Sequence, residues 1–197
     1  RPSEAGEILI SDQAVTNTSP RKIASLGVGH IPEDREKHGV IGVYSVEQNA
    51  MINRYHRKPF SLRGLLQRRS ITSHAKEVVN EFDVRTPRLD TAVVTLSGGN
   101  KQKLIVGREF SGEIKFLIAA QPTRGIDIGA IEFIHKSIIK KRDEGAAVLL
   151  VSAELDEIIG LADRIAVLFE GKIVAVLDAA EADREKIGLL MAGVGMS

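Results

Sequence analysis

The stretch that most constrains the fold is residues 95–103, Thr-Leu-Ser-Gly-Gly-Asn-Lys-Gln-Lys. It runs directly into a helical pattern over 101–110, with apolar residues at 104–106 and at Phe110. A helix that begins at a Ser-Gly-Gly turn presents free backbone N–H groups and the positive end of its dipole, and the glycines admit a close ligand. The turn therefore suits a phosphate, although the same residues also make an ordinary capped helix start.

Two strand-length apolar runs follow this helix, at 115–120 and 147–152. The first leads into the turn Gln121-Pro122-Thr123-Arg124-Gly125-Ile126-Asp127, and a helix is predicted over 128–142. Because buried strands alternate with helices, the pattern predicts an α/β fold with a mostly parallel sheet.

The Leu-Ser-Gly-Gly and Pro-Thr-Arg-Gly-Ile-Asp motifs at this spacing resemble the nucleotide-binding domain of ABC transporters, and the resemblance runs from 6–10 to 171–174. Pro-Glu-Asp-Arg at 32–35 resembles the C-terminal half of the double-domain importers for simple sugars and nucleosides, and Ala-Gln-Pro-Thr-Arg-Gly at 120–125 resembles the nucleoside group. The resemblance implies a P-loop NTPase-like core with an inserted helical subdomain and a C-terminal β-hairpin.

A length of 197 residues fits one domain. We expect a single, partial nucleotide-binding domain with a helical subdomain at about 45–112, an α/β core of 1–44 and 113–178, and a helical tail over 179–197. The other expected elements are strands at 6–10 and 28–32, helices at 20–26, 45–53, 71–82 and 154–161, hairpin strands at 164–169 and 172–177, and a terminal helix at 179–191.

The segment 56–69 is basic, with Tyr55 and Phe60 as its nearest aromatic residues. It can face a membrane surface or a permease helix, or it can be a solvated face or loop of the helical insertion. The whole chain has a net charge of only +1, so no global basic excess indicates nucleic acid. Cysteine is absent, which excludes disulfides and thiolate metal sites, and no apolar run is long enough to span a membrane.

The phosphate cradle G-x-x-x-x-G-K-[ST] does not occur in this chain. Its one Gly-Lys pair is Gly171-Lys172, which lies in the predicted hairpin and is followed by Ile173. In the family the cradle precedes the equivalent of 6–10, so we expect the chain to begin just after it. A true loss in the parent protein is the alternative.

Three further positions depart from the family pattern. Ala120 stands where the metal-binding Asp is normal, Gln121 where the Glu that polarises water is normal, and Ala153 where a switch His is normal. A methyl group cannot bind Mg²⁺ and an amide cannot accept a proton at neutral pH. The half-site that this domain builds on its own core is therefore predicted to be degenerate, with no residues of its own for catalysis or metal binding.

The resemblance assigns roles to the residues that do match. Ser97, Gly98, Gly99 and Asn100 are expected to contact the γ-phosphate of an ATP held by a second nucleotide-binding domain, and Asp127 to couple the two sites. An N-cap role for Asp127 is compatible with that assignment. Glu33 takes the position of the family's loop Gln, with a solvated charged turn as the alternative.

The function implied is that of an ATP-binding subunit fragment of an ABC importer for a nucleoside or simple sugar. Its expected cofactors are ATP and Mg²⁺ in the assembled pair, and its expected partners are a second nucleotide-binding half, a permease and, indirectly, a substrate receptor. The place implied is the cytoplasmic face of the inner membrane. We expect negligible hydrolysis by the chain alone and self-association through the strand edge left without its neighbour. The alternative is a non-catalytic coupling module that binds the permease and the active half.

Overall fold

The computed structural model describes residues 2–193 and divides the chain into two compact units, Arg1–Leu149 and Leu150–Ser197, which are described separately. The helices are α1 (Pro20–Ser25), α2 (Val46–Met51), α3 (Arg68–Glu81), α4 (Gly98–Phe110), α5 (Ile128–Asp143), α6 (Leu155–Leu161) and α7 (Arg184–Met191), with shorter turns η1 (Arg35–Gly39), η2 (Val93–Thr95) and η3 (Ala179–Glu181). The strands are β1 (Leu9–Ile10), β2 (Gln13–Ala14), β3 (Val28–Ile31), β4 (Ser61–Leu62), β5 (Leu65–Leu66), β6 (Phe116–Ala120), β7 (Ala147–Val151), β8 (Arg164–Phe169) and β9 (Lys172–Asp178).

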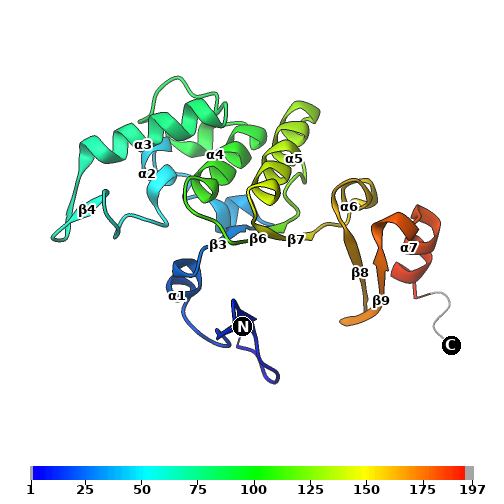
Figure 1. Cartoon of the computed structure of the whole chain (residues 1–197). Helices are drawn as coiled ribbons and strands as arrows, with labels where there is room; N and C mark the ends of the chain where they lie inside the picture. Colours follow the sequence, from blue (N-terminus) through cyan, green and yellow to red (C-terminus); the bar gives the residue numbers. More distant parts are fainter. Residues whose placement is uncertain (1, 194–197) are drawn as a thin grey trace. The chain divides into compact units, whose positions relative to one another are not determined.

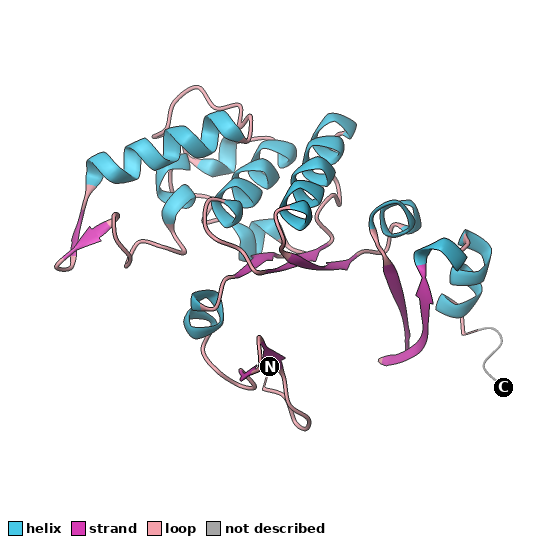
Figure 2. Ribbon diagram, in the orientation of Figure 1, coloured by secondary structure: helices cyan, strands magenta, loops and turns pink. Residues whose placement is uncertain are grey.

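A three-stranded sheet in the order β3-β6-β7 forms the centre of the α/β core. The strands β3 and β6 are parallel, in a register that pairs Val28 with Phe116 and Ile31 with Ala119. The side chains of Ile31, Leu117 and Ala119 are fully buried, as expected for strands covered by helices. Figures 1 and 2 show α3, α4 and α5 on one side of β3 and β6 and α1 on the other. The predicted α/β fold and its parallel strand pair are confirmed.

The helix α4 lies at the centre of the first unit, in contact with β3, α2, α3 and α5. Its apolar residues Leu104, Ile105 and Val106 are fully buried. A β-carbon at Gly107 would lie 2.8 Å from the side chains of Val78 and Phe82 on and just after α3, so only glycine permits this close helix packing. The helix carrying the Ser-Gly-Gly turn at its start is therefore held firmly in the core.

Asn49 on α2 ties down the loop that precedes this helix. It is fully buried, and its side-chain oxygen accepts from the Ile41 N–H at 2.9 Å. Its side-chain nitrogen donates to the carbonyls of Ile41, Tyr44 and Ser45 at 3.0, 3.3 and 3.1 Å. Ser45 and Gln48 complete a capping box at the start of α2. One amide thus supplies the acceptor for the Ile41 N–H and a second donor to three loop carbonyls that already accept from backbone N–H groups.

Replacing Asn49 with alanine is expected to lower the free energy of unfolding by about 1–3 kcal/mol, because it removes the side-chain hydrogen bonds to the 41–45 loop and leaves the Ile41 N–H without its acceptor. Urea denaturation monitored by circular dichroism measures the change. Asn80→Ala is the matched control, since Asn80 lies exposed on α3, and it is expected to change the value by no more than about 0.5 kcal/mol. Equal effects of the two substitutions would contradict this role for Asn49.

The structure corrects the sequence interpretation in three places. The strand expected over 6–10 is only β1, Leu9–Ile10, which forms a small antiparallel hairpin with β2. The basic segment 56–69 contains the hairpin β4–β5, which no sequence pattern predicted, because each of its strands has only two residues. A helical turn of the wide π type, η1, occupies 35–39, beginning at the last residue of the Pro-Glu-Asp-Arg motif, and no helical element was predicted there.

The second unit contains the predicted hairpin of β8 and β9, with Arg164 opposite Asp178 and Phe169 opposite Lys172. Ile165 and Val167 on β8 pack with Ile187 on α7 to form its small core. The helix expected over 179–191 is divided into η3 and α7, and the Asp183 side chain caps α7 by accepting from the N–H groups of Glu185 and Lys186. Residues 194–197 of the expected tail lie outside the described residues.

Candidate functional site

The Ser-Gly-Gly turn opens α4 as the sequence predicted. The Ser97 Oγ caps the helix by accepting from the Asn100 N–H at 3.4 Å and from the Asn100 side-chain nitrogen at 2.9 Å. The Asn100 side-chain oxygen accepts from the Arg85 N–H at 2.7 Å, which ties the turn to the segment after α3. Both polar side chains are therefore used to brace the turn, while the first-turn N–H groups of Gly98 and Gly99 have no acceptor within the helix.

The turn 121–127 follows β6 and leads into α5. Gln121 and Gly125 both adopt positive φ angles, of +49° and +65°, so the chain reverses sharply after the strand. Asp127 caps α5 by accepting from the Ala130 N–H at 3.0 Å, the N-cap role that the sequence predicted. A β-carbon at Gly99 would lie 2.7 Å from the Asp127 Oδ2. Asp127 is thus packed directly against the glycine turn, and its coupling role stays a prediction.

Arg35 joins this turn to the start of α4. Its guanidinium donates to the carbonyl oxygens of Arg124 and Gly125 at 2.6 and 3.1 Å. The same guanidinium lies 3.3 Å from where a β-carbon of Gly98 would be. Arg35 lies in the Pro-Glu-Asp-Arg motif that carried the resemblance, but no sequence pattern predicts its contacts, because its acceptors are 89 and 90 residues away. It places a positive charge beside the open backbone of the glycine turn.

Two ion pairs hold the same three segments together. Glu33 pairs with Arg124 at 3.0 Å, with both side chains largely exposed, so the pair contributes little to stability. Glu36 pairs with the buried Lys101 of α4 at 2.8 Å. Three segments that are far apart in the sequence therefore meet at one place: the loop containing Glu33, the glycine turn and the turn 121–127. Their backbone N–H groups, helix dipole and Arg35 together can bind an anion.

The positions predicted to be degenerate give the first unit no carboxylate after β6. Ala120 ends the strand and Gln121 follows it, so neither supplies the carboxylate that a magnesium site uses. Among residues 2–193 no group of three or more His, Asp or Glu side chains is arranged to hold a metal ion. Ala153 lies in the second unit, between β7 and α6. The two side chains at the end of β6 do not fit a magnesium ion, and the degenerate half-site stays a prediction.

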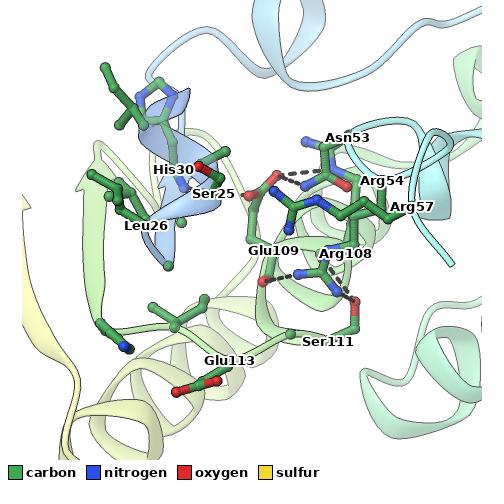
Figure 3. Close-up of a pocket in the computed structure, with 18 of the residues that line it drawn as sticks. Ser25, Leu26, His30, Asn53, Arg54, Arg57, Arg108, Glu109, Ser111 and Glu113 are labelled. Atoms are coloured by element: carbon green, nitrogen blue, oxygen red, sulfur yellow. Dashed lines mark hydrogen bonds and ion pairs between the residues drawn. The ribbon is translucent and has the colours of Figure 1, made fainter. Parts of the chain in front are cut away.

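A cavity of about 1190 Å³ lies elsewhere in the first unit, against α1, β3 and the C-terminal end of α4. Figure 3 shows the Glu109 carboxylate at its wall among Asn53, Arg54 and Arg108. Glu109 pairs with Arg108 at 3.0 Å and accepts from the Asn53 side chain at 3.2 Å and the His30 N–H at 3.4 Å. Burial lowers the pKa of His30, an effect that Glu109 opposes. Both oxygens of the Glu109 carboxylate therefore accept hydrogen bonds from the protein, and we assign Glu109 a structural role.

Comparison with curated proteins finds relatives along nearly the whole chain. The guanosine import ATP-binding protein NupO of Bacillus subtilis is 48% identical over 193 residues, which are 98% of this chain and 38% of that protein. The nucleoside import ATP-binding protein NupA of Lactococcus lactis is 44% identical over 96% of this chain and 38% of its own length. The ribose import ATP-binding protein RbsA 1 of Rubrobacter xylanophilus is 36% identical over 98% and 38%, respectively. The chain thus spans less than two fifths of these relatives.

Solved structures show the same fold. The ATP-binding cassette MJ0796, in a dimeric post-hydrolysis state bound to ADP and Pi, matches 91% of this chain and 75% of its own with a TM-score of 0.75 at 17% identity. The ADP conformation of the ABC transporter cassette MJ1267 matches 98% of this chain and 75% of its own with a TM-score of 0.71. No family model matches the chain. In the part of the chain that the structure describes, every helix is too short or too polar to cross a bilayer.

Proposed function

We propose that this chain, whose homologues are nucleoside, ribose and sugar import ATP-binding proteins and whose fold is that of an ATP-binding cassette, is part of the ATP-binding subunit of an ABC importer. The cargo is a nucleoside or a simple sugar, because the relatives named for guanosine and nucleosides are 48% and 44% identical and one named for glucose is 44% identical. The importer binds ATP and Mg²⁺ as an assembled pair of nucleotide-binding halves. It works beside a permease at the cytoplasmic face of the membrane.

Within that pair, the chain supplies its glycine turn to the ATP of the other half. The observation that carries this proposal is the contrast between the two parts of the site. The Asn100 side chain ties the turn 97–100 to the Arg85 N–H, and Arg35 and Asp127 lie close to Gly98 and Gly99. Ala120 and Gln121 offer neither a metal ligand nor a base. A preformed donor cradle beside a degenerate half-site favours action on a partner's triphosphate.

The test compares ATP hydrolysis by the chain alone, by the second nucleotide-binding half alone and by their mixture. We expect the chain alone to hydrolyse ATP negligibly, and the mixture to exceed the second half alone by at least about tenfold, because its site then gains the missing donors. Ser97→Ala in the mixture tests the turn itself, with the exposed Ser73→Ala of α3 as the matched control. A mixture no faster than the second half alone would contradict the proposal.

A second candidate is a coupling module that never binds a nucleotide on its own half. Ala120 and Gln121 favour it, because neither supplies a carboxylate to a metal ion or a base to water. In this case the mixture still gains activity, but the assembled importer binds one ATP for each pair of halves. Equilibrium binding of labelled ATP to the assembled importer counts the sites and separates the two candidates.

A further inference from the structure

Positive charge is concentrated between α2 and α3. Residues 48–76 contain seven Lys or Arg residues and no Asp or Glu. The remainder of the chain therefore holds 20 of the 27 basic residues and all 26 acidic residues, and it is net negative although the whole chain is +1. A local excess of this kind in an otherwise balanced chain indicates a surface that attracts anions.

Most of these basic side chains make no hydrogen bond or ion pair within the described residues. Six of the seven basic side chains are exposed. Five of these six lie within 57–69, and none of the five has a side-chain hydrogen bond or ion pair within residues 2–193: Arg57, Lys58, Arg63, Arg68 and Arg69. Arg54 differs, because it is partly buried and donates to the Ser111 Oγ at 3.0 Å and the Glu109 carbonyl at 3.1 Å. The free cations thus lie on the β4–β5 hairpin and on the chain immediately before and after it.

The hairpin itself presents leucines to solvent. Leu62 pairs directly with Leu65, so their side chains lie on one face of the ribbon, with 50% and 72% of their surface exposed, and Leu66 on the other face is 52% exposed. Arg63 and Gly64 form the turn, with φ angles of +51° and +81°, as in the tight two-residue turns typical of hairpins. The tip therefore combines three apolar side chains with an arginine.

The base of the β4–β5 hairpin is anchored to the helices, and this holds the tip of the hairpin in place at the surface. Phe60 is buried in a cluster with Met51 of α2 and Ile71 of α3, and its carbonyl accepts from the Gln67 N–H at 2.8 Å. Figure 1 shows the hairpin at the start of α3, extending away from the helices of the first unit, and Figure 2 shows it as a separate strand pair. The leucines at the tip have no core to join.

We propose that residues 57–69 form a docking surface for an anionic lipid bilayer, in which Leu62, Leu65 and Leu66 enter the headgroup region and the surrounding cations contact lipid phosphates. Moving the exposed leucine side chains out of water lowers the free energy. A basic face that stays in water would leave this apolar surface exposed.

A nucleic acid fits less well, because binding to bases relies on aromatic stacking. The one aromatic residue within 57–69, Phe60, is buried, and the exposed Tyr55 lies before the segment, where its hydroxyl accepts from Arg21 at 3.2 Å. This proposal goes beyond the proposed function, because lipid binding by residues 57–69 does not require a bound nucleotide.

The test is co-sedimentation of the 197-residue chain with vesicles of 30% phosphatidylglycerol and 70% phosphatidylcholine, compared with pure phosphatidylcholine. We expect binding to the anionic vesicles only, weakening as salt rises. Each basic residue near an anionic surface contributes about fivefold in affinity, so Arg63→Gln/Arg68→Gln/Arg69→Gln is expected to lose roughly 100-fold. Leu62→Ser/Leu65→Ser is expected to lose at least about tenfold without losing charge.

The matched control, Lys136→Gln/Lys172→Gln/Lys186→Gln, removes the same charge from exposed lysines outside the segment, and it is expected to bind within about twofold of the parent. Thermal melting followed by circular dichroism confirms that each variant is folded. The proposal is overturned by absence of vesicle binding, by equal losses in the control, by binding unaffected by the leucine substitutions, or by stronger binding to a single-stranded oligonucleotide. ATP hydrolysis in the mixture assay reports on the proposed function independently of all these outcomes.

Discussion

A valine at position 99 is expected to lower ATP hydrolysis by the assembled pair at least about 100-fold. A β-carbon there would lie 2.7 Å from the Asp127 Oδ2 and 3.2 Å from the Ala130 β-carbon, and valine adds two methyl groups to it. Asp127 cannot simply swing aside, because its carboxylate caps α5. The glycine turn must move instead, and a displacement of about 1 Å in a group that positions a substrate costs about 100-fold in rate.

Steady-state phosphate release by the mixed halves measures this effect, and binding of a non-hydrolysable ATP analogue by the second half shows whether its site is intact. Gly160→Val is the matched control, since a β-carbon at this helical glycine would meet no atom within 4 Å, and it is expected to retain at least half of the parental rate. Full activity of a folded Gly99→Val pair would show that the turn does not approach the triphosphate.

The sequence predicts the parts of this fold in which local pattern and burial agree. The runs 28–32, 115–120 and 147–152 are mostly apolar and of strand length, and all three become strands of the central sheet. Burial is greatest in β3 and β6, whereas Leu149 and Val151 of β7 are 49% and 48% exposed. The hairpin of β8 and β9 follows from its Glu170-Gly171 turn, where both residues adopt positive φ. The β4–β5 hairpin is not predicted from the sequence, because strands of two residues are too short to show an alternation of apolar and polar residues.

The site is only partly predictable, for a different reason. Ser97 and Asp127 are recognisable as helix caps, because capping depends on residues three positions apart in the sequence. Arg35 is not, because its acceptors Arg124 and Gly125 lie 89 and 90 residues away and depend on how η1 packs beside the turn after β6. Sequence pattern can identify a charged loop, whereas the partner of each charge is decided by tertiary packing.

Restoring the two carboxylates is expected to produce the largest gain. In the assembled importer, with hydrolysis at the other half silenced, Ala120→Asp/Gln121→Glu is expected to raise turnover about 100- to 10,000-fold, the range that a general base typically contributes. The Asp supplies a magnesium ligand at the end of β6, and the Glu can accept a proton that the amide cannot. Glutamate is expected to fit the backbone at 121, whose φ of +49° glutamine already tolerates.

Single-turnover hydrolysis measures this gain, and each single substitution serves as a control, because a base without its metal ligand and a metal ligand without its base should each remain within about tenfold of the parent. The result also separates the two proposed functions. A gain requires that this half hold a triphosphate of its own, since a base and a metal ligand accelerate nothing without one. If the double variant stays inactive while the importer binds one ATP for each pair of halves, the chain is a coupling module, and its glycine turn serves only the nucleotide of its partner.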